Sequence, residues 1–194
     1  MLNGFRSFYG FNSVELPIVR DGLRIYLDVK NPNSYSPPVY WNGSYLGGGL
    51  ALNDLSGNGN NFSFPTGAPT YTAGSHPYLS TDKLGQGPAS NSVGITLATG
   101  YTIQILANNR SLVNSSAFKF YQGNYSGSAG RGIFAHLPWS NDNVYFDQGG
   151  CCNADQRVNT ATGGSNSWNL WTFRRNSSSR DIWKNGTRIA TNTT

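Results

Sequence analysis

Few side chains in this sequence are of the types that carry catalysis, and the carboxylates come first among them. Enzymes that cleave glycans need a pair of carboxyl groups, one as acid and the other as nucleophile or base. The chain has a single glutamate, Glu15, and its aspartates form no paired pattern: Asp21, Asp28, Asp54, Asp82, Asp142, Asp147, Asp155 and Asp181. We therefore expect that the protein is not a glycan hydrolase and not an enzyme.

The two histidines lie in unrelated sequence contexts. His76 stands directly before Pro77, in a segment typical of a loop, and His136 falls in an alternating segment next to Phe134. No Ser–His–Asp or Cys–His arrangement can be built from these positions. We expect His136 to be a packed or hydrogen-bonded strand residue.

Cys151 and Cys152 are adjacent and are the only cysteines. They cannot form a structural zinc site alone, because such a site needs four ligands. A disulfide between neighbouring residues requires a strained turn. The sequence predicts reduced, partly buried cysteines, and a vicinal disulfide is the alternative for a protein in an oxidising compartment.

The loop at residues 53–61 contains the best set of oxygen ligands for a cation. Asp54, Asn58 and Asn60 offer hard oxygen atoms, and Asp28 or Asp147 would have to complete the shell, since Ca²⁺ takes about six to eight oxygens. A tight turn without metal explains the same residues, because glycine and asparagine tolerate positive φ. Ca²⁺ is thus the one cofactor that the sequence suggests.

Four aromatic residues fall in a segment rich in proline and glycine at residues 30–49: Tyr35, Tyr40, Trp41 and Tyr45. Exposed rings stack on the faces of sugars, and aromatic residues are also enriched at protein interfaces. Two interpretations follow. The rings bind carbohydrate, or they cover the domain and contact a neighbouring subunit.

These side chains must be positioned by short strands. Alternation at 133–139 and 144–147, broken by turn residues at 140–143, predicts a β-hairpin in the middle of a sheet. Asn185-Gly186 predicts a second hairpin. No segment shows helical periodicity, and further strands are predicted at 18–29, 62–64, 78–80, 92–97, 101–107, 118–121, 156–160, 168–174, 180–183 and 187–190. Many short strands separated by turns are typical of an all-β, antiparallel two-sheet jelly roll.

Charge and hydropathy limit the partners. The net charge of +5 comes from dispersed arginines, without the basic stripe of a nucleic-acid-binding protein. No apolar run reaches the roughly 20 residues that span a membrane, and the N-terminus does not read as a signal peptide. We therefore expect no nucleic-acid or membrane partner. The aromatic residues of 1–17 indicate an arm that packs on a neighbour or on the domain itself.

Four segments fall in an order that resembles one family: YLDVKNPNSY (26–35), NDLSGNGNN (53–61), GIFAHLPWSNDNVYFDQGGCC (132–152) and DIWKNGTRIA (181–190). They resemble the laminin-G-like, concanavalin A-like lectin-glucanase jelly rolls of tailed-bacteriophage structural proteins. The resemblance covers about residue 18 to the C-terminus, so it implies an arm at 1–17 and a jelly-roll domain at 18–194. The family's closing strands after the last hairpin are missing, which implies an open sheet edge covered by a partner or by a longer chain.

The resemblance also implies a role. It suggests a non-enzymatic virion structural protein, such as a head decoration, tail fibre or spike. Such a protein attaches to other virion proteins through its arm and its open sheet edge, forms an oligomer and adheres to host-surface glycans. The alternative is a carbohydrate-binding module of a secreted or cell-surface protein, with an extracellular rather than a virion location.

Overall fold

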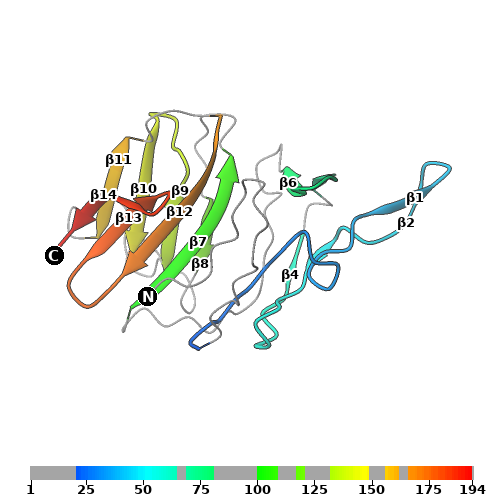
Figure 1. Ribbon diagram of the computed structural model, residues 1–194, viewed down its shortest axis with the longest axis horizontal. Helices are drawn as coiled ribbons and strands as arrows, with labels where there is room; N and C mark the ends of the chain where they lie inside the picture. Colours follow the sequence, from blue (N-terminus) through cyan, green and yellow to red (C-terminus); the bar gives the residue numbers. More distant parts are fainter. Residues whose placement is uncertain are drawn as a thin grey trace. The chain divides into compact units, whose positions relative to one another are not determined.

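A computed structural model describes residues 21–64, 69–80, 100–108, 117–120, 132–148, 156–161 and 166–193. Within these ranges every regular element is a β-strand, and all pairings are antiparallel (Figure 1). The predicted all-β class is confirmed, and these ranges contain no helix that could cross a membrane. The arm expected at 1–17 and the strand expected at 92–97 lie outside the described residues.

The chain divides into two compact units, residues 1–94 and residues 95–194. The first unit contains three small antiparallel pairs and a core of Tyr35, Leu52 and Phe64, on which Phe62, Tyr71 and Leu79 of two of the pairs pack. The pairs are β1 (Val39–Trp41) with β2 (Ser44–Gly47), β3 (Ala51–Leu52) with β4 (Phe62–Ser63), and β5 (Thr70–Thr72) with β6 (Tyr78–Ser80). Strands β4 and β6 were predicted, whereas β1, β2 and β5 were not.

The strand predicted at 18–29 is wrong within its described part, because residues 21–29 form no strand. Their backbone groups are bound by a neighbouring loop instead of by a strand. The Tyr26 N–H donates to Oδ1 of Asp54 at 2.9 Å, and the Arg24 carbonyl accepts from the Ser56 hydroxyl at 3.0 Å. Leu27 and Val29 of this segment still pack on the first unit's core.

The second unit consists of two four-stranded antiparallel sheets. One has the order β14-β13-β12-β7 and the other the order β11-β10-β9-β8. The central position expected for the hairpin β9–β10 is confirmed. The strands are β7 (Tyr101–Asn108), β8 (Phe118–Phe120), β9 (Ile133–His136), β10 (Asn143–Gln148), β11 (Arg157–Ala161), β12 (Trp168–Arg175), β13 (Arg180–Lys184) and β14 (Thr187–Asn192).

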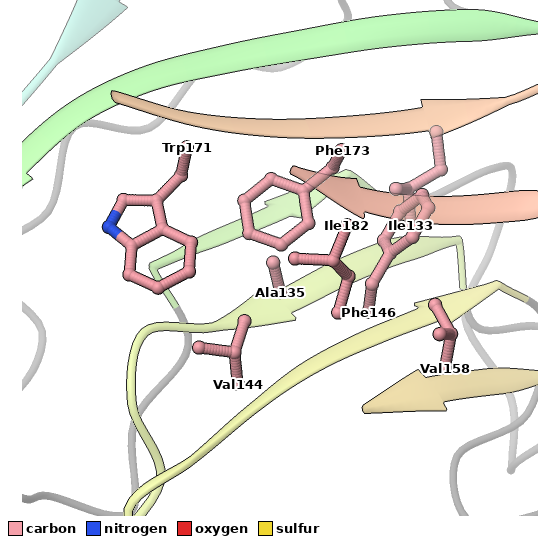
Figure 2. Packing of buried hydrophobic residues seen from close by; sticks show 8 residues of the cluster. All are labelled: Ile133, Ala135, Val144, Phe146, Val158, Trp171, Phe173 and Ile182. Carbon is pink, nitrogen blue, oxygen red and sulfur yellow. The ribbon is translucent and has the colours of Figure 1, made fainter. Parts of the chain in front are cut away.

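The two sheets of the second unit share one hydrophobic core. Figure 2 shows Trp171, Phe173 and Ile182 extending from one sheet toward Val144 and Phe146 on the other. The rings of Phe146 and Phe173 lie 5.4 Å apart between centroids, and all five side chains are fully buried. Burial of each large apolar side chain contributes about 1.5–3 kcal/mol. This core therefore fixes which face of each sheet points outward.

Charge is divided unequally between the units. Residues 1–94 contain five basic and five acidic residues, whereas residues 95–194 contain nine basic and four acidic residues. The whole net charge of +5 therefore belongs to the second unit. The first unit is neutral overall.

Candidate functional site

The outer face of the β9–β10–β11 layer gathers polar and aromatic side chains. Successive strand residues point to opposite faces, so Tyr145 and Asp147 face away from the core that buries Val144 and Phe146. Cross-strand register places His136 opposite Tyr145 and Arg157 opposite Asp147. With Trp139 these residues form what we call the Tyr145 cluster: His136, Trp139, Tyr145, Asp147 and Arg157.

An ion pair lies at the base of the Tyr145 cluster. Arg157 donates from Nε to Oδ1 of Asp147 at 2.6 Å and from Nη2 to Oδ2 at 2.7 Å, which is the two-pronged geometry that guanidinium and carboxylate favour. Asp147 is 1% exposed, and Nε2 of His136 lies 3.7 Å from its Oδ2. Burial acts to raise the pKa of Asp147, but the bonds from Arg157 and His136 outweigh it and hold that pKa below its ordinary value.

The aromatic part of the cluster is partly exposed. The Arg157 guanidinium lies 4.4 Å from the Tyr145 ring centroid, and the rings of His136 and Trp139 meet edge to face at 4.6 Å. Nδ2 of Asn141 donates to the Tyr145 hydroxyl at 2.7 Å. These contacts hold the rings in fixed orientations on a rigid sheet. The cluster thus combines partly exposed rings with amide and guanidinium donors.

The cluster is suited to binding rather than to acid–base catalysis. Both oxygens of Asp147 accept from Arg157, and the lowered pKa keeps this carboxyl ionised near neutral pH. In the parts of the second unit that the structure describes, the other carboxylates are Asp142 in the β9–β10 turn and Asp181 in the other sheet. No second carboxyl therefore lies beside Asp147 among these residues to complete a glycosidase pair.

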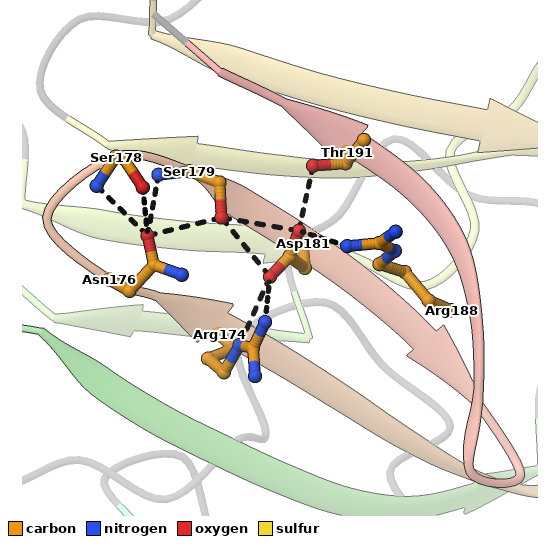
Figure 3. Close-up of polar contacts among 7 residues, drawn as sticks. All are labelled: Arg174, Asn176, Ser178, Ser179, Asp181, Arg188 and Thr191. Carbon is orange, nitrogen blue, oxygen red and sulfur yellow. Dashed lines mark hydrogen bonds and ion pairs between the residues drawn. The ribbon is translucent and has the colours of Figure 1, made fainter.

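The other sheet holds its own buried carboxylate. Asp181 is fully buried, and its Oδ2 accepts from Nε and Nη2 of Arg174 at 3.0 and 2.6 Å (Figure 3). The Thr191 hydroxyl donates to Oδ1 at 2.7 Å, and the Ser179 hydroxyl lies 3.3 Å from Oδ2. Burial acts to raise the pKa of Asp181, and these bonds together with the Arg174 charge lower it overall. These contacts link Asp181 on β13 to Arg174 on β12, to Thr191 on β14 and to Ser179 in the β12–β13 turn, which indicates a structural role.

The loop predicted to bind Ca²⁺ uses its oxygens internally. Each oxygen of Asp54 has two donors: Oδ1 accepts from the N–H groups of Tyr26 and Ser56, and Oδ2 from the Ser56 hydroxyl and the Asn60 N–H. The Asn58 and Asn60 amides donate to the carbonyls of Leu23 and Arg24. Burial opposes these bonds, which still lower the pKa of Asp54.

A cation at this loop would displace donors that hold residues 23–26, so the residues do not fit a Ca²⁺ site. Among the described residues, no group of three or more His, Cys, Asp or Glu side chains is placed to hold a metal. The completing ligands expected for the shell are also engaged elsewhere. Asp147 is bound by Arg157 in the second unit, and Oδ2 of Asp28 accepts from the Tyr26 hydroxyl.

Comparison with known proteins finds no match. No family model, curated protein or solved structure matches the chain. Functional inference therefore depends on the geometry of the described residues.

The four aromatic residues predicted to form an exposed group do not share one environment. Tyr35 is 1% exposed and belongs to the core with Leu52 and Phe64, so the expectation that its ring is exposed is wrong. The backbone of Tyr40, Trp41 and Tyr45 forms the β1–β2 hairpin, with Tyr40 directly opposite Tyr45 and Trp41 opposite Ser44. Tyr35 precedes this hairpin and anchors the segment by burial.

The remaining predicted positions have separate outcomes. Cys151 and Cys152 lie outside the described residues. His76 is exposed, with its Nδ1 at 3.1 Å from the Ser75 hydroxyl. His136 is the packed strand histidine that was expected, although its contact with Asp147 was not foreseen.

The Asp147–Arg157 pair, and with it the Tyr145 cluster, was not predicted from the sequence. The two residues are ten positions apart, across a connection that contains the cysteines, and only the β10–β11 register brings them together. The available signal was a lone aspartate directly after the apolar and aromatic residues Val144 to Phe146. A charged residue in such a position is rarely buried unless it is paired.

Proposed function

We propose that this chain is a non-enzymatic structural and adhesion protein of a tailed-bacteriophage particle, either a head decoration, a tail fibre or a spike. Its second unit is the centre of a concanavalin A-like jelly roll. The paired four-stranded sheets around one core support this fold, because that layered antiparallel arrangement is what the family resemblance implies. It attaches to other virion proteins as an oligomer, through residues 1–17 and a sheet edge.

The observation that carries this proposal is the state of the buried carboxylates. Each carboxylate is paired with one arginine, which donates two hydrogen bonds to it: Arg157 to Asp147 and Arg174 to Asp181. A carboxyl held in this way stabilises a fold and transfers no proton near neutral pH. Rigid sheets with arginine-locked carboxylates and partly exposed rings favour adhesion over catalysis.

The Tyr145 cluster is the surface that we assign to host-glycan binding. Tyr145 and Trp139 are partly exposed on a rigid layer, beside amide and guanidinium groups that can bond to hydroxyls. The same cluster supports the second candidate, a carbohydrate-binding module of a secreted or cell-surface protein. Both candidates share this surface and differ in where the protein resides.

Two measurements test the proposal. Glycan-array binding of the full 194-residue chain should be reduced at least tenfold by Trp139→Ala and unchanged by Trp168→Ala, a tryptophan that is 46% exposed on the other sheet. Equal binding by both variants would remove the Tyr145 cluster from consideration. Mass spectrometry of purified phage particles should detect the chain, whereas detection only in medium or on cells would favour the module.

A further inference from the structure

Three asparagine–glycine pairs lie within the described residues: Asn42-Gly43, Asn58-Gly59 and Asn185-Gly186. The side-chain amide of such an asparagine is open to attack by the next backbone nitrogen, because glycine has no Cβ to shield that nitrogen. The attack requires the amide carbon Cγ to reach the nitrogen in a suitable orientation. The contacts of each asparagine therefore determine which pair reacts.

Two of the pairs occupy the same kind of turn. Asn42-Gly43 joins β1 to β2, and Asn185-Gly186 joins β13 to β14. The φ angles are 47° and 78° in the first turn and 51° and 83° in the second, which is the backbone of a two-residue hairpin loop. All four residues are exposed. Sequence, backbone and exposure match, so the two turns differ in their contacts.

Asn185 is held against β12 by its backbone and its side chain. Its N–H donates to the Leu170 carbonyl at 2.8 Å, and its Oδ1 accepts from the Leu170 N–H at 2.9 Å. Its Nδ2 donates to Oδ1 of the buried Asn169 at 2.9 Å. Rotation of this amide toward Gly186 breaks both side-chain bonds, and the net free energy of each bond slows the reaction severalfold.

The Asn58 amide is held in a similar way. Its Nδ2 donates to the Leu23 carbonyl at 2.8 Å and to the Ser56 hydroxyl at 2.9 Å. These bonds belong to the loop that binds the backbone of residues 23–26. Attack at Asn58 therefore also has to break at least two side-chain hydrogen bonds.

Asn42 lacks such restraints. Its side chain forms no hydrogen bond with any residue that the structure describes. Among those residues, β1 and β2 form a two-stranded sheet, whereas β13 lies between β12 and β14 in a four-stranded one. A two-stranded hairpin is marginally stable, so this turn can open locally to the geometry that the attack needs.

We propose that Asn42 is a site of spontaneous deamidation, at which the chain converts asparagine to aspartate and isoaspartate. The Gly43 backbone nitrogen attacks Cγ of Asn42 and forms the new C–N bond of a cyclic succinimide. The bond from Cγ to Nδ2 breaks, and Nδ2 leaves as ammonia with the proton that the Gly43 nitrogen gives up. Water then opens the ring. Its addition at Cγ gives aspartate, and its addition at the backbone carbonyl gives isoaspartate.

The conversion changes the hairpin of the first unit. It adds one negative charge to a unit that is neutral overall, and isoaspartate also adds a methylene group to the backbone of the turn. The turn directly follows Trp41, in the segment predicted to bind carbohydrate or a neighbouring subunit. The site is separate from the Tyr145 cluster and does not depend on the proposed function.

Incubation of the full native chain at mildly alkaline pH tests the site, because the attacking amide loses its proton more readily there. Tandem mass spectrometry after proteolysis locates each conversion, and water enriched in heavy oxygen labels every acid formed during the incubation. We expect Asn42 to convert at least about tenfold faster than Asn58 or Asn185, since two side-chain hydrogen bonds must break first at each of those residues. Equal or slower conversion at Asn42 would overturn the proposal.

The same measurement in concentrated urea removes the structural difference between the pairs. Asn42, Asn58 and Asn185 should then convert at similar rates, because each is followed by glycine. If Asn185 reacted as fast in the native chain as in urea, its contacts would give no protection and the reasoning would be wrong. This comparison uses the unmodified protein and needs no variant to fold.

A variant tests the protecting contact directly. Asn169→Ala removes the acceptor for Nδ2 of Asn185, so it should speed conversion at Asn185 severalfold and leave the rate at Asn42 unchanged. Urea unfolding of the variant shows whether its fold is retained. An unchanged rate at Asn185 in a folded variant would count against the role that we assign to side-chain hydrogen bonds.

Discussion

Arg157→Met should destabilise the second unit more than Asp147→Asn. Met keeps much of the arginine's apolar volume and removes both donors to Asp147, whose carboxylate is 1% exposed and cannot reach water. In the converse variant, Arg157 keeps its charge but its side chain is 22% exposed and can be hydrated. The two changes break the same pair, yet only the first leaves a buried charge without its main partner.

The magnitude follows from this asymmetry. Removing one partner of a buried ion pair costs about 3–5 kcal/mol, and we expect this loss for Arg157→Met at pH 7. His136 remains 3.7 Å from Asp147 and replaces only part of the interaction. Asp147→Asn loses charge-assisted hydrogen bonds without stranding a buried charge, so a smaller loss of about 1.5–3 kcal/mol is expected.

The pH dependence gives a second signature. The folded-state pKa of Asp147 is below its unfolded value, so the stability from this group is present above the unfolded pKa and is lost as pH falls through the folded pKa. In Arg157→Met, burial dominates and raises the pKa of Asp147. The variant's penalty should therefore shrink as pH is lowered from 7 toward about 4.5, where Asp147 can take up a proton.

Urea unfolding followed by tryptophan fluorescence measures both effects, because Trp171 is fully buried in the core. The matched control is Arg188→Gln, a half-exposed arginine 4.0 Å from Asp181, for which we expect a loss of at most about 1 kcal/mol. A loss below 1 kcal/mol for Arg157→Met at pH 7, or a loss that stays constant down to pH 4.5, would refute the reasoning.

Three further predictions test the core, the loop and a backbone contact. Phe146→Ala should cost about 3–5 kcal/mol in urea unfolding, and a loss under 1 kcal/mol would contradict the shared core. Asp54→Ala should cost about 1–3 kcal/mol and speed proteolysis within 21–30, while Ca²⁺ should leave the wild-type Tm unchanged; a Ca²⁺-specific rise over Mg²⁺ would reverse our assignment. Gly48→Ala should lower the Tm more than Gly43→Ala. Both have a φ near +80°, but only at Gly48 would an added Cβ collide with the Pro37 carbonyl oxygen, and equal effects would refute that contact.

The strands of the second unit were predictable because their local signals agree with their packing. β12 alternates, and its inward residues Trp171 and Phe173 are those that the core buries. Asn185 and Gly186 both have positive φ, the backbone that a two-residue hairpin turn requires. In each of these segments local preference and burial point to the same structure.

The first unit was harder to predict because its backbone is satisfied by side chains. Residues 23–26 look like a strand by alternation, but the donors and acceptors that bind them belong to Asp54, Ser56, Asn58 and Asn60. The same loop was interpreted as a cation site because oxygen-rich side chains serve both purposes. Composition cannot tell whether an aspartate binds a metal or a row of N–H groups.

Most of the candidate site could not be predicted, because its contacts depend on the register between strands. Sequence showed Asp147 and Arg157 as isolated charges, and pairing across β10 and β11 depends on where each strand begins. Contacts between distant strands are therefore the part that a single sequence does not reveal.

The pairing of β7 with β12 joins residues that are 60 to 74 positions apart, from Trp168↔Asn108 to Arg175↔Tyr101. Closing so large a loop costs chain entropy before the strand pairing can stabilise the chain. Domains rich in such pairings therefore fold slowly. During synthesis, Ile103 and Ile105 of β7 stay exposed to solvent until β12 has left the ribosome. We expect nascent chains to depend on a chaperone for that interval, and a truncation before residue 168 to aggregate.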